Sequence, residues 1–390
     1  MDKSKWEYKK LGELGNICTG GTPPTKDARN YSSDDYCFVK PSDLTDERVL
    51  FLDDSEFHVS SYAYSNSRKL PKGSVLVCCI GSIGKLGVLN MDATCNQQIN
   101  AIIPNLDMDS KFIAYSLLAS KGRLLDIANA PVVPIINKSQ FSNFEIKIYP
   151  FIDQQRIVSE LDCLNEMIAV KQEQLKEFDK LAQSIFYDMF GDPLFNEKGW
   201  IVKTLGEIGT LQRGRGIQKK DFVVTGRPCI HYGQLHTSFS EYATKHISCI
   251  SQDLYDVSII AHRGDLIMAL TSEDVEGSCK STAWLGDYDI AVSSDAAVFS
   301  HNQGPIYVSY YTKTRAFFNE KQKYANGFKV THIKSGDIAS IPIPLPPLSL
   351  QQQFADKISA IEAQKELVKQ SIAETQQLLD YTMEKYFGYD

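Results

Sequence analysis

Long apolar runs, paired cysteines and a leader peptide are all missing from this sequence. It contains no apolar stretch of the roughly 20 residues that a membrane-spanning helix needs. It does not open on a charged segment followed by an apolar one, and its nine cysteines include no C-x-x-C pair. We therefore expect a cytoplasmic protein with no membrane partner, whose thiols are reduced and mostly in the core.

Motifs for catalysis and metal binding are missing as well. The segment GSIGK at 81–85 lacks the G-x-x-x-x-G-K-[ST] spacing of an ATP-binding loop. The segment DPLF at 192–195 lacks the second proline of the amino-methyltransferase motif, and no glycine-rich cofactor loop follows a strand. His231 and His236 flank Tyr232 and Gln234, and an extended 231–236 could put some of these four on one strand face, but no third ligand at metal spacing accompanies the two histidines. We expect a binding protein with no catalytic residue, metal or cofactor of its own.

What the sequence does contain is one long repeat. LGELG at 11–15 returns 194 residues later as LGEIG, and QQ at 154–155, near the start of a polar segment, returns 197 residues later. Two copies of a domain followed by a helix predict a pseudo-twofold molecule. The predicted parts are a globular domain at 1–150, a central helix at 151–192, a second globular domain at 193–345 and a C-terminal helix at 346–390.

The acidic residues are concentrated in the two predicted helices. The chain has a net charge of −7, but 151–192 holds nine acids and four bases, and 346–390 holds seven acids and four bases. The two globular segments are therefore close to neutral. The overall charge does not exclude a nucleic-acid partner, because each globular domain can still carry a basic face.

Both helical segments carry apolar residues at alternating steps of four and three, the pattern of a coiled coil. If a twofold axis relates the two copies, the second helix runs antiparallel along the first and ends near the first domain, in a rod of roughly 50 Å. Lys171 and Lys365 interrupt this seam and can fix its register. A plain dimerisation or spacer coil is the alternative interpretation. The predicted seam residues are Ile157, Leu161, Leu164, Ile168, Leu175, Phe178, Ile185, Phe354, Ile358, Ile361, Val368, Ile372 and Leu379.

The two globular segments predict α+β domains. Short β-branched or aromatic runs at 74–80, 100–103, 265–268 and 296–299 predict strands. Longer stretches at 110–126 and 305–320 predict helices. The fold class expected is thus two tandem α+β domains related by a pseudo-twofold axis and separated by two long helices packed as an antiparallel coiled coil.

One local signal favours nucleic acid. Residues 211–230 hold five bases and one acid, with glycines beside arginines, which let backbone and guanidinium groups approach a phosphate or a base edge. Arginine can bind guanine and glutamine can bind adenine. The matching segment at 19–29 is far less basic, and a solvated loop is the alternative for both. The candidate DNA contacts are Thr22, Lys26, Arg29, Arg213, Arg215, Gln218, Lys219, Lys220, Arg227, Tyr232, Gln234, His236, Thr271 and Ser272.

Over its whole length the chain resembles the specificity (S) subunit of type I restriction–modification systems. The matching segments are LGELG at 11–15 with G-T-P at 21–23, KPSDL at 40–44, the glycine-rich turn at 81–85, and a proline followed by QQRI at 154–157, opening a helix that ends with FGDP at 190–193. The second copy departs at Gln353, where the family often has arginine, and has TSED at 271–274 in place of the glycine-rich turn. From these segments we add Lys40, Ser42 and Lys85 to the candidate DNA contacts.

The resemblance implies that each globular half is a target recognition domain for one half of a split sequence in double-stranded DNA. It implies that two modification subunits, which carry S-adenosylmethionine and methylate adenine, dock on this chain. Restriction subunits that use ATP and Mg would join them, and this chain would hold no cofactor. Residue patterns alone leave open a two-headed adaptor with a coiled-coil spacer, and they do not give the recognised bases.

Overall fold

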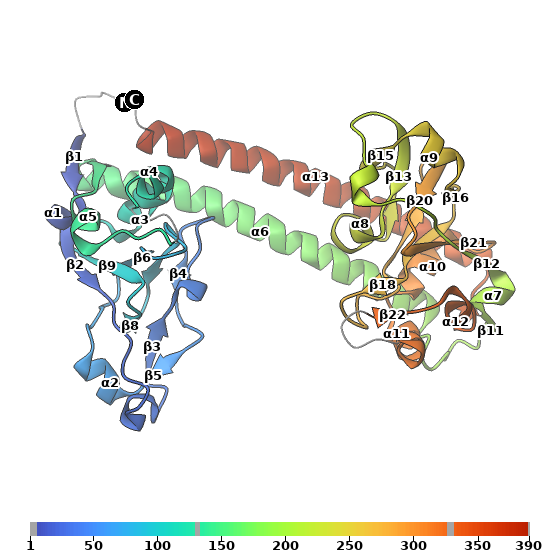
Figure 1. Ribbon diagram of the computed structural model, residues 1–390, viewed down its shortest axis with the longest axis horizontal. Helices are drawn as coiled ribbons and strands as arrows, with labels where there is room; N and C mark the ends of the chain where they lie inside the picture. The colour runs from blue at the N-terminus through green and yellow to red at the C-terminus, as the bar shows by residue number, and fades with distance from the viewer. Residues whose placement is uncertain (1–5, 129–132, 326–330, 389–390) are drawn as a thin grey trace. The chain divides into compact units, whose positions relative to one another are not determined.

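The computed structural model describes residues 6–128, 133–325 and 331–388 (Figure 1). The chain forms two compact units. Unit 1 consists of Met1–Glu173 and Lys369–Asp390, and unit 2 is Gln174–Val368. Each unit therefore contains one globular domain and parts of both long helices. No helix among the described residues is long and apolar enough to cross a membrane.

The globular domain of unit 1, domain 1, is built on two sheets and a two-stranded ribbon. The five-stranded sheet has the order β2 (Gly15–Thr19), β9 (Ile99–Pro104), β6 (Val75–Cys78), β7 (Leu86–Leu89) and β4 (Phe51–Leu52). The second sheet has the order β5 (His58–Val59), β3 (Tyr36–Val39) and β8 (Ala93–Cys95), and the ribbon pairs β1 (Glu7–Lys10) with β10 (Glu145–Ile148). The helices are α1 (Leu11–Leu14), η2 (Ala28–Tyr31), η3 (Pro41–Asp43), α2 (Ser61–Asn66), α3 (Ser110–Ala119), α4 (Lys121–Asp126) and α5 (Lys138–Ser142).

Domain 2, the globular domain of unit 2, repeats this plan. Its five-stranded sheet has the order β12 (Gly209–Arg213), β21 (Ala296–His301), β17 (Leu266–Ala269), β19 (Ser281–Trp284) and β14 (Tyr242–Ala243). Its second sheet runs β15 (Ser248–Ile250), β13 (Arg227–Ile230), β20 (Ile290–Val292) and β16 (Ile259–Ala261), and its ribbons pair β11 (Ile201–Thr204) with β23 (Pro342–Leu345) and β18 (Thr271–Ser272) with β22 (Thr331–His332). The helices are α7 (Leu205–Ile208), η4 (Lys219–Asp221), α8 (Tyr232–Thr237), α9 (Gln252–Asp256), α10 (Pro305–Tyr311), α11 (Arg315–Lys321), η5 (Gln322–Tyr324) and α12 (Ser335–Ala339).

Strand pairing shows that the two domains are copies. The outer pair β4–β7 is parallel, and so is its counterpart β14–β19. The pair β3–β8 is parallel, as is β13–β20. Glu7 pairs with Ile148 in domain 1, and Ile201 pairs with Leu345 in domain 2, so this one ribbon reproduces both sequence offsets of the repeat. Domain 2 differs by the extra strand β16 and the β18–β22 ribbon.

The central strand of each five-stranded sheet is buried on both faces, as its uninterrupted apolar run predicts. Because side chains alternate along a strand, Val75 and Val77 of β6 enter one core, whereas Leu76 and Cys78 enter the other. The first core is closed by α3 and by the long helices, and the second lies toward the three-stranded sheet. Leu266 and Ile267 of β17 divide in the same way.

The long helices α6 (Phe151–Phe190) and α13 (Leu348–Phe387) pair antiparallel within each unit. In unit 1 the Tyr149 hydroxyl, just before α6, donates to the carbonyl of Tyr386 near the end of α13 (2.9 Å). In unit 2 the ring of Phe190, at the end of α6, lies 5.2 Å from that of Phe354 near the start of α13. The predicted fold class is confirmed. The predicted seam residues in both helices are all buried or half-buried.

Both lysines of the seam bond across to the other helix. Lys171 Nζ donates to Thr375 Oγ1 (2.7 Å) and to the Ser371 carbonyl (3.3 Å). Lys365 Nζ lies 2.8 Å from Asp179 Oδ1 on α6 and 2.6 Å from Glu362 Oε1 on its own helix. A shift by one turn would leave these buried or half-buried cations without partners, so both support the present register.

The helix boundaries fall close to those predicted. α6 ends at Phe190, two residues before the predicted limit, and α13 begins at Leu348, two residues after it. Gly191 follows α6 with φ 74°, the left-handed conformation that commonly ends a helix. Lys198 Nζ donates to the carbonyls of Asp188 and Met189, which the helix leaves without intrahelical partners.

Candidate DNA-binding surfaces

The basic loop of domain 2 is held firmly by its own backbone. A Cβ at Gly214 would lie 2.1 Å from the Ser293 carbonyl oxygen, so only glycine allows this close approach. Gly216 has φ 78°, and Ile217 is buried beneath the loop at 2% exposure. The loop thus presents its charged side chains from a fixed backbone.

The cations of this loop differ in the hydrogen bonds and ring contacts that they already make within the domain. Arg213 Nε donates to the Ser294 carbonyl (2.6 Å), and its Nη2 lies 3.2 Å from Asp295 Oδ1, although the side chain is 62% exposed. Arg227 stacks on the ring of Tyr255 at 4.3 Å. The remaining predicted contacts on this loop are exposed: Arg215, Gln218, Lys219 and Lys220.

A cleft of about 1430 Å³ in domain 2 brings together residues that are far apart in the sequence. Its walls include five of the predicted contacts: Lys219, Tyr232, His236, Thr271 and Ser272. His236 Nε2 lies 3.0 Å from the Thr271 carbonyl oxygen, which joins α8 to β18. Other lining residues carry both signs of charge, among them Lys280, Lys313, Arg315, Glu273, Asp274 and Glu276.

The extended conformation considered for 231–236 is wrong, because Tyr232–Thr237 is the helix α8. His231 caps this helix: its Nδ1 accepts from the Gly233 amide, while Gln234 Oε1 accepts from the His231 amide. This reciprocal capping favours the helical conformation. Burial, and then the charge of Lys219, lowers the pKa of His231, which favours the neutral ring that can accept this bond.

Capping also uses the side chain of Gln234. Its Oε1 accepts from the His231 amide (2.9 Å), and its Nε2 donates to Ser248 Oγ (2.7 Å). Both ends of the amide are therefore engaged within the domain, which counts against Gln234 as a base reader. Tyr232 and His236 remain on the cleft wall.

In domain 1 the corresponding loop follows β2 and is largely neutralised. Arg29 forms a two-pronged ion pair with Asp27, with Nε–Oδ1 2.9 Å and Nη2–Oδ2 2.7 Å, and lies over the Tyr62 ring at 4.5 Å. The side-chain bond from Arg29 lowers the pKa of Asp27. Thr22 Oγ1 donates to Gln97 Oε1 (2.6 Å), and Lys26 is exposed.

The other predicted contacts of domain 1 lie in two turns. Lys40 Nζ is 3.0 Å from the centre of the Phe57 ring, and Ser42 is exposed on η3. Lys85 is half-buried in the turn after β6, where Gly81 and Gly84 have φ of 77° and 85°. In domain 2 the segment 271–274, which begins with the strand β18, follows β17, the counterpart of β6, so it occupies the place of the domain 1 turn.

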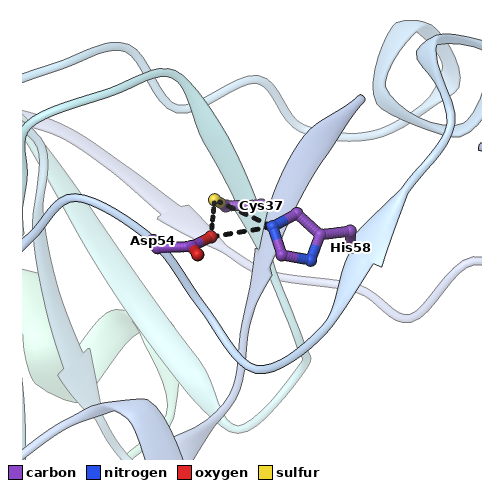
Figure 2. Close-up of side chains that lie close together, drawn as sticks. All are labelled: Cys37, Asp54 and His58. Carbon is purple, nitrogen blue, oxygen red and sulfur yellow. Dashed lines mark hydrogen bonds and ion pairs between the residues drawn. The ribbon is translucent and has the colours of Figure 1, made fainter. Parts of the chain in front are cut away.

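Two sets of polar residues were missed by the sequence reasoning. Cys37, Asp54 and His58 converge in domain 1 (Figure 2). Their contact depends on the pairing of β3 with β5, which no local pattern signals. Gln154 and Gln351 were noted for their repeat, but their burial (1% each) and bonding were not anticipated.

These two glutamines fasten the start of each long helix to its domain. Gln154 Oε1 accepts from the amide of Asp109 (3.0 Å), the residue that caps α3, and its Nε2 donates to the Tyr149 carbonyl (2.8 Å). Gln351 does the same with the amide of Gly304 (2.7 Å), before α10, and with the Pro346 carbonyl (2.8 Å). The repeated glutamine therefore has the same structural role in both copies.

Comparison with known proteins gives consistent results. A protein-family model described as "Type I restriction modification DNA specificity domain" matches residues 3–178 and again 197–377. The MjaIX specificity subunit of Methanocaldococcus jannaschii is 27% identical over 236 residues, which cover 55% of this chain and 54% of that protein. The EcoR124I/EcoR124II specificity subunit of Escherichia coli is 30% identical over 200 residues, covering 49% and 48%. These matches thus span about half the length of each relative.

Solved structures show the same fold. The S subunit of a type I restriction–modification system from M. genitalium has a TM-score of 0.55 at 12% identity, covering 100% of this chain and 98% of that one. A chain from a structure on complex assembly and conformational transition of the type I R-M system has a TM-score of 0.60 at 17% identity, covering 98% and 97%. Because the family model covers most of the sequence in two copies, the chain belongs to the type I restriction–modification DNA specificity family.

Proposed function

We propose that this chain reads a split sequence in double-stranded DNA, one half with each globular domain, and performs no catalysis itself. It docks two modification subunits that methylate adenine, together with restriction subunits. S-adenosylmethionine, ATP and Mg belong to those partners, and the complex acts in the cytoplasm.

The duplication carries this proposal. Two domains whose five-stranded sheets have the same strand order present different loops in equivalent positions, which is what two readers of different half-sites require. In domain 2 the predicted contacts Lys219, Tyr232 and Thr271 share the wall of one cleft. Exposed cations supply phosphate contacts, whereas aromatic and hydroxyl groups can contact bases.

The helix pair supports a frame role. Each long helix begins at one domain, fastened by Gln154 or Gln351, and its far end joins the core of the other unit. Such a frame leaves the loops free to differ between chains while the docking surface for partner subunits stays constant. Methylation also requires the target adenine to leave the base stack, while the reader holds the flanking duplex.

Exchange of one domain tests the two-reader idea. Residues 193–345 lie between the end of α6 and the start of α13, so they can be replaced by the same segment of a relative without cutting either helix. Expressed with its partner subunits, the hybrid should change one half of the methylated sequence, read by sequencing modified bases. Exchange of 1–150 should change the other half, and a change in both halves or in neither would contradict the proposal.

Single substitutions test the DNA contacts. Arg215→Ala removes an exposed cation and should cost about 1–3 kcal/mol of binding free energy if the side chain reads a base. Arg213→Ala should lie at the lower end of that range, because Asp295 and the Ser294 carbonyl already engage its guanidinium. Arg29→Ala should cost less, because Asp27 already neutralises it. Binding is measured with the partner subunits at several salt concentrations, since phosphate contacts weaken with salt. An affinity that does not depend on salt would favour a two-headed adaptor instead.

A further inference from the structure

Three side chains of domain 1, all of types that can bind a metal ion, bring their ligand atoms close together. Figure 2 shows Cys37 on β3, His58 on β5 and Asp54 on the segment before β5. Cys37 Sγ lies 3.5 Å from Asp54 Oδ1 and 3.7 Å from His58 Nε2, and His58 Nε2 lies 2.8 Å from Asp54 Oδ1. None of these residues is among the predicted DNA contacts.

The fold fixes each of the three. Cys37 and His58 are direct partners in the antiparallel pairing of β3 with β5, which places their side chains on the same face. The amide of Ser55 donates to Asp54 Oδ1 (2.8 Å) and holds the carboxylate. Cys37 is buried at 8% exposure, whereas the Asp54 side chain is 77% exposed, so one side of the cluster is open to solvent.

This geometry does not fit a cysteine nucleophile. In a nucleophile–histidine–acid triad the nucleophile and the acid use different ring nitrogens, so that the acid orients the base. Here both Cys37 Sγ and Asp54 Oδ1 approach the same atom, Nε2 of His58. Burial also raises the pKa of the Cys37 thiol, whereas a nucleophilic cysteine requires a lowered one.

The same geometry does fit a metal ion. A tetrahedral zinc ion with Zn–S near ~2.3 Å and Zn–N near ~2.0 Å holds its sulfur and nitrogen ligands about 3.5 Å apart. The observed separations from sulfur, 3.5 and 3.7 Å, already match this value. The distance between His58 Nε2 and Asp54 Oδ1, now 2.8 Å, would have to lengthen by about half an ångström to suit zinc. The Asp54 carboxylate can move by this amount because it is exposed.

We propose that Cys37 Sγ, Asp54 Oδ1 and His58 Nε2 bind one divalent transition-metal ion of the zinc type, with water in the fourth position. Binding forms three protein–metal bonds, releases the thiol proton of Cys37 to solvent, and requires the His58 tautomer with its proton on Nδ1, so that Nε2 exchanges its hydrogen bond to Asp54 for the metal. The ion would join β3, β5 and the segment between them, which includes Phe57 beneath Lys40 Nζ. A bound metal would therefore hold in place Phe57, whose ring supports the predicted DNA contact Lys40.

Cobalt is a spectroscopic substitute that tests the proposal on the full-length chain. Co²⁺ is added to the reduced, metal-free protein, and the thiolate-to-cobalt absorption is followed. We expect one equivalent to bind and zinc to displace it. Cys37→Ser should abolish this absorption, and His58→Gln should weaken binding at least tenfold. Cys163→Ser is the matched control, because this thiol is exposed on α6, and it should bind as the unmodified chain does.

Thermal unfolding gives a second readout. Zinc should raise the unfolding midpoint of the unmodified chain and of Cys163→Ser, but not of Cys37→Ser or Asp54→Asn, because a ligand stabilises the state that binds it. Asp54→Asn alters an exposed side chain, so its fold should persist, as circular dichroism would show. Binding of less than one equivalent, or an unchanged cobalt spectrum in Cys37→Ser, would overturn the proposal.

Discussion

The loop after the first strand of the five-stranded sheet differs between the two domains far more than the sheet does. In domain 1 its arginine, Arg29, is paired with Asp27 and stacked on Tyr62. Both loops are pinned by a glycine, Gly20 in domain 1 and Gly214 in domain 2, but the domain 2 loop also carries Arg215, which is exposed. Strand order, parallel pairs and helix attachment are shared. The comparison shows that one frame supports two chemically distinct surfaces.

Core aromatics at the helix ends should give the largest effect. Phe186 of α6 is buried at 1% and packs against Tyr307 (5.7 Å) and Phe354 (5.6 Å). Phe186→Ala should lower the unfolding free energy by about 3–5 kcal/mol. Its counterpart in α13 is Met383, which is half-buried, so Met383→Ala should cost less. Hydrogen exchange with mass spectrometry would locate the first loss in unit 2 and the second in unit 1. Equal losses in both units would contradict this difference.

The buried glutamines should give a smaller effect that is the same in both copies. Gln154→Ala leaves the Asp109 amide and the Tyr149 carbonyl without these partners, and Gln351→Ala does the same to Gly304 and Pro346. Each should cost about 1–3 kcal/mol in denaturant unfolding.

The neighbouring exposed glutamines are matched controls for this change. Gln155→Ala and Gln352→Ala should each change stability by less than about 0.5 kcal/mol. A large loss for Gln154→Ala with none for Gln351→Ala would show that the two attachments are not equivalent.

The smallest expected effect is a pH dependence that arises from one histidine of domain 2. His262 Nδ1 lies 2.8 Å from Asp289 Oδ1, and this bond raises the pKa of His262 above 6.5. A histidine whose pKa is raised by folding stabilises the fold at pH values below its pKa in the unfolded chain. This stabilisation is lost as the pH rises through its pKa in the folded protein. Domain 1 has Pro71 in the matching position, which does not titrate.

Substitution of His262 measures how much its pair with Asp289 contributes to the stability of the fold. Both side chains are well exposed, so solvent screening limits the pair to a fraction of ~1 kcal/mol. His262→Gln should reduce stability at about pH 5.5 and leave it unchanged at about pH 8.5. A loss of equal size at both values would assign His262 a role other than its charge.

The frame could be predicted from the sequence because its signals are periodic or repeated. The offsets of 194 and 197 residues reappear in the pairing of β1 with β10 and of β11 with β23. The seam predicted the helix pair, and Lys171 and Lys365, predicted as polar breaks that can fix the register, each bond to the other helix. The strands at 74–80 and 265–268 were confirmed within two residues.

The site could be predicted only in part, because it depends on contacts between distant segments. The segment 231–236 was considered as a strand, but mutual capping by His231 and Gln234 makes it a helix. The cluster of Cys37, Asp54 and His58 exists through the register of two short strands. The cleft of domain 2 joins α8, β18 and α11, whose approach no local pattern encodes.

The exchange of helix ends between units has a consequence for synthesis of the protein on the ribosome. Tyr386 and Phe387, at the end of α13, are buried in the core of unit 1, where the ring of Phe387 lies 5.4 Å from that of Phe112. Domain 1 is translated first, but this part of its core arrives more than two hundred residues later. The nascent domain must therefore wait with an apolar face uncovered until translation reaches the last turns of α13.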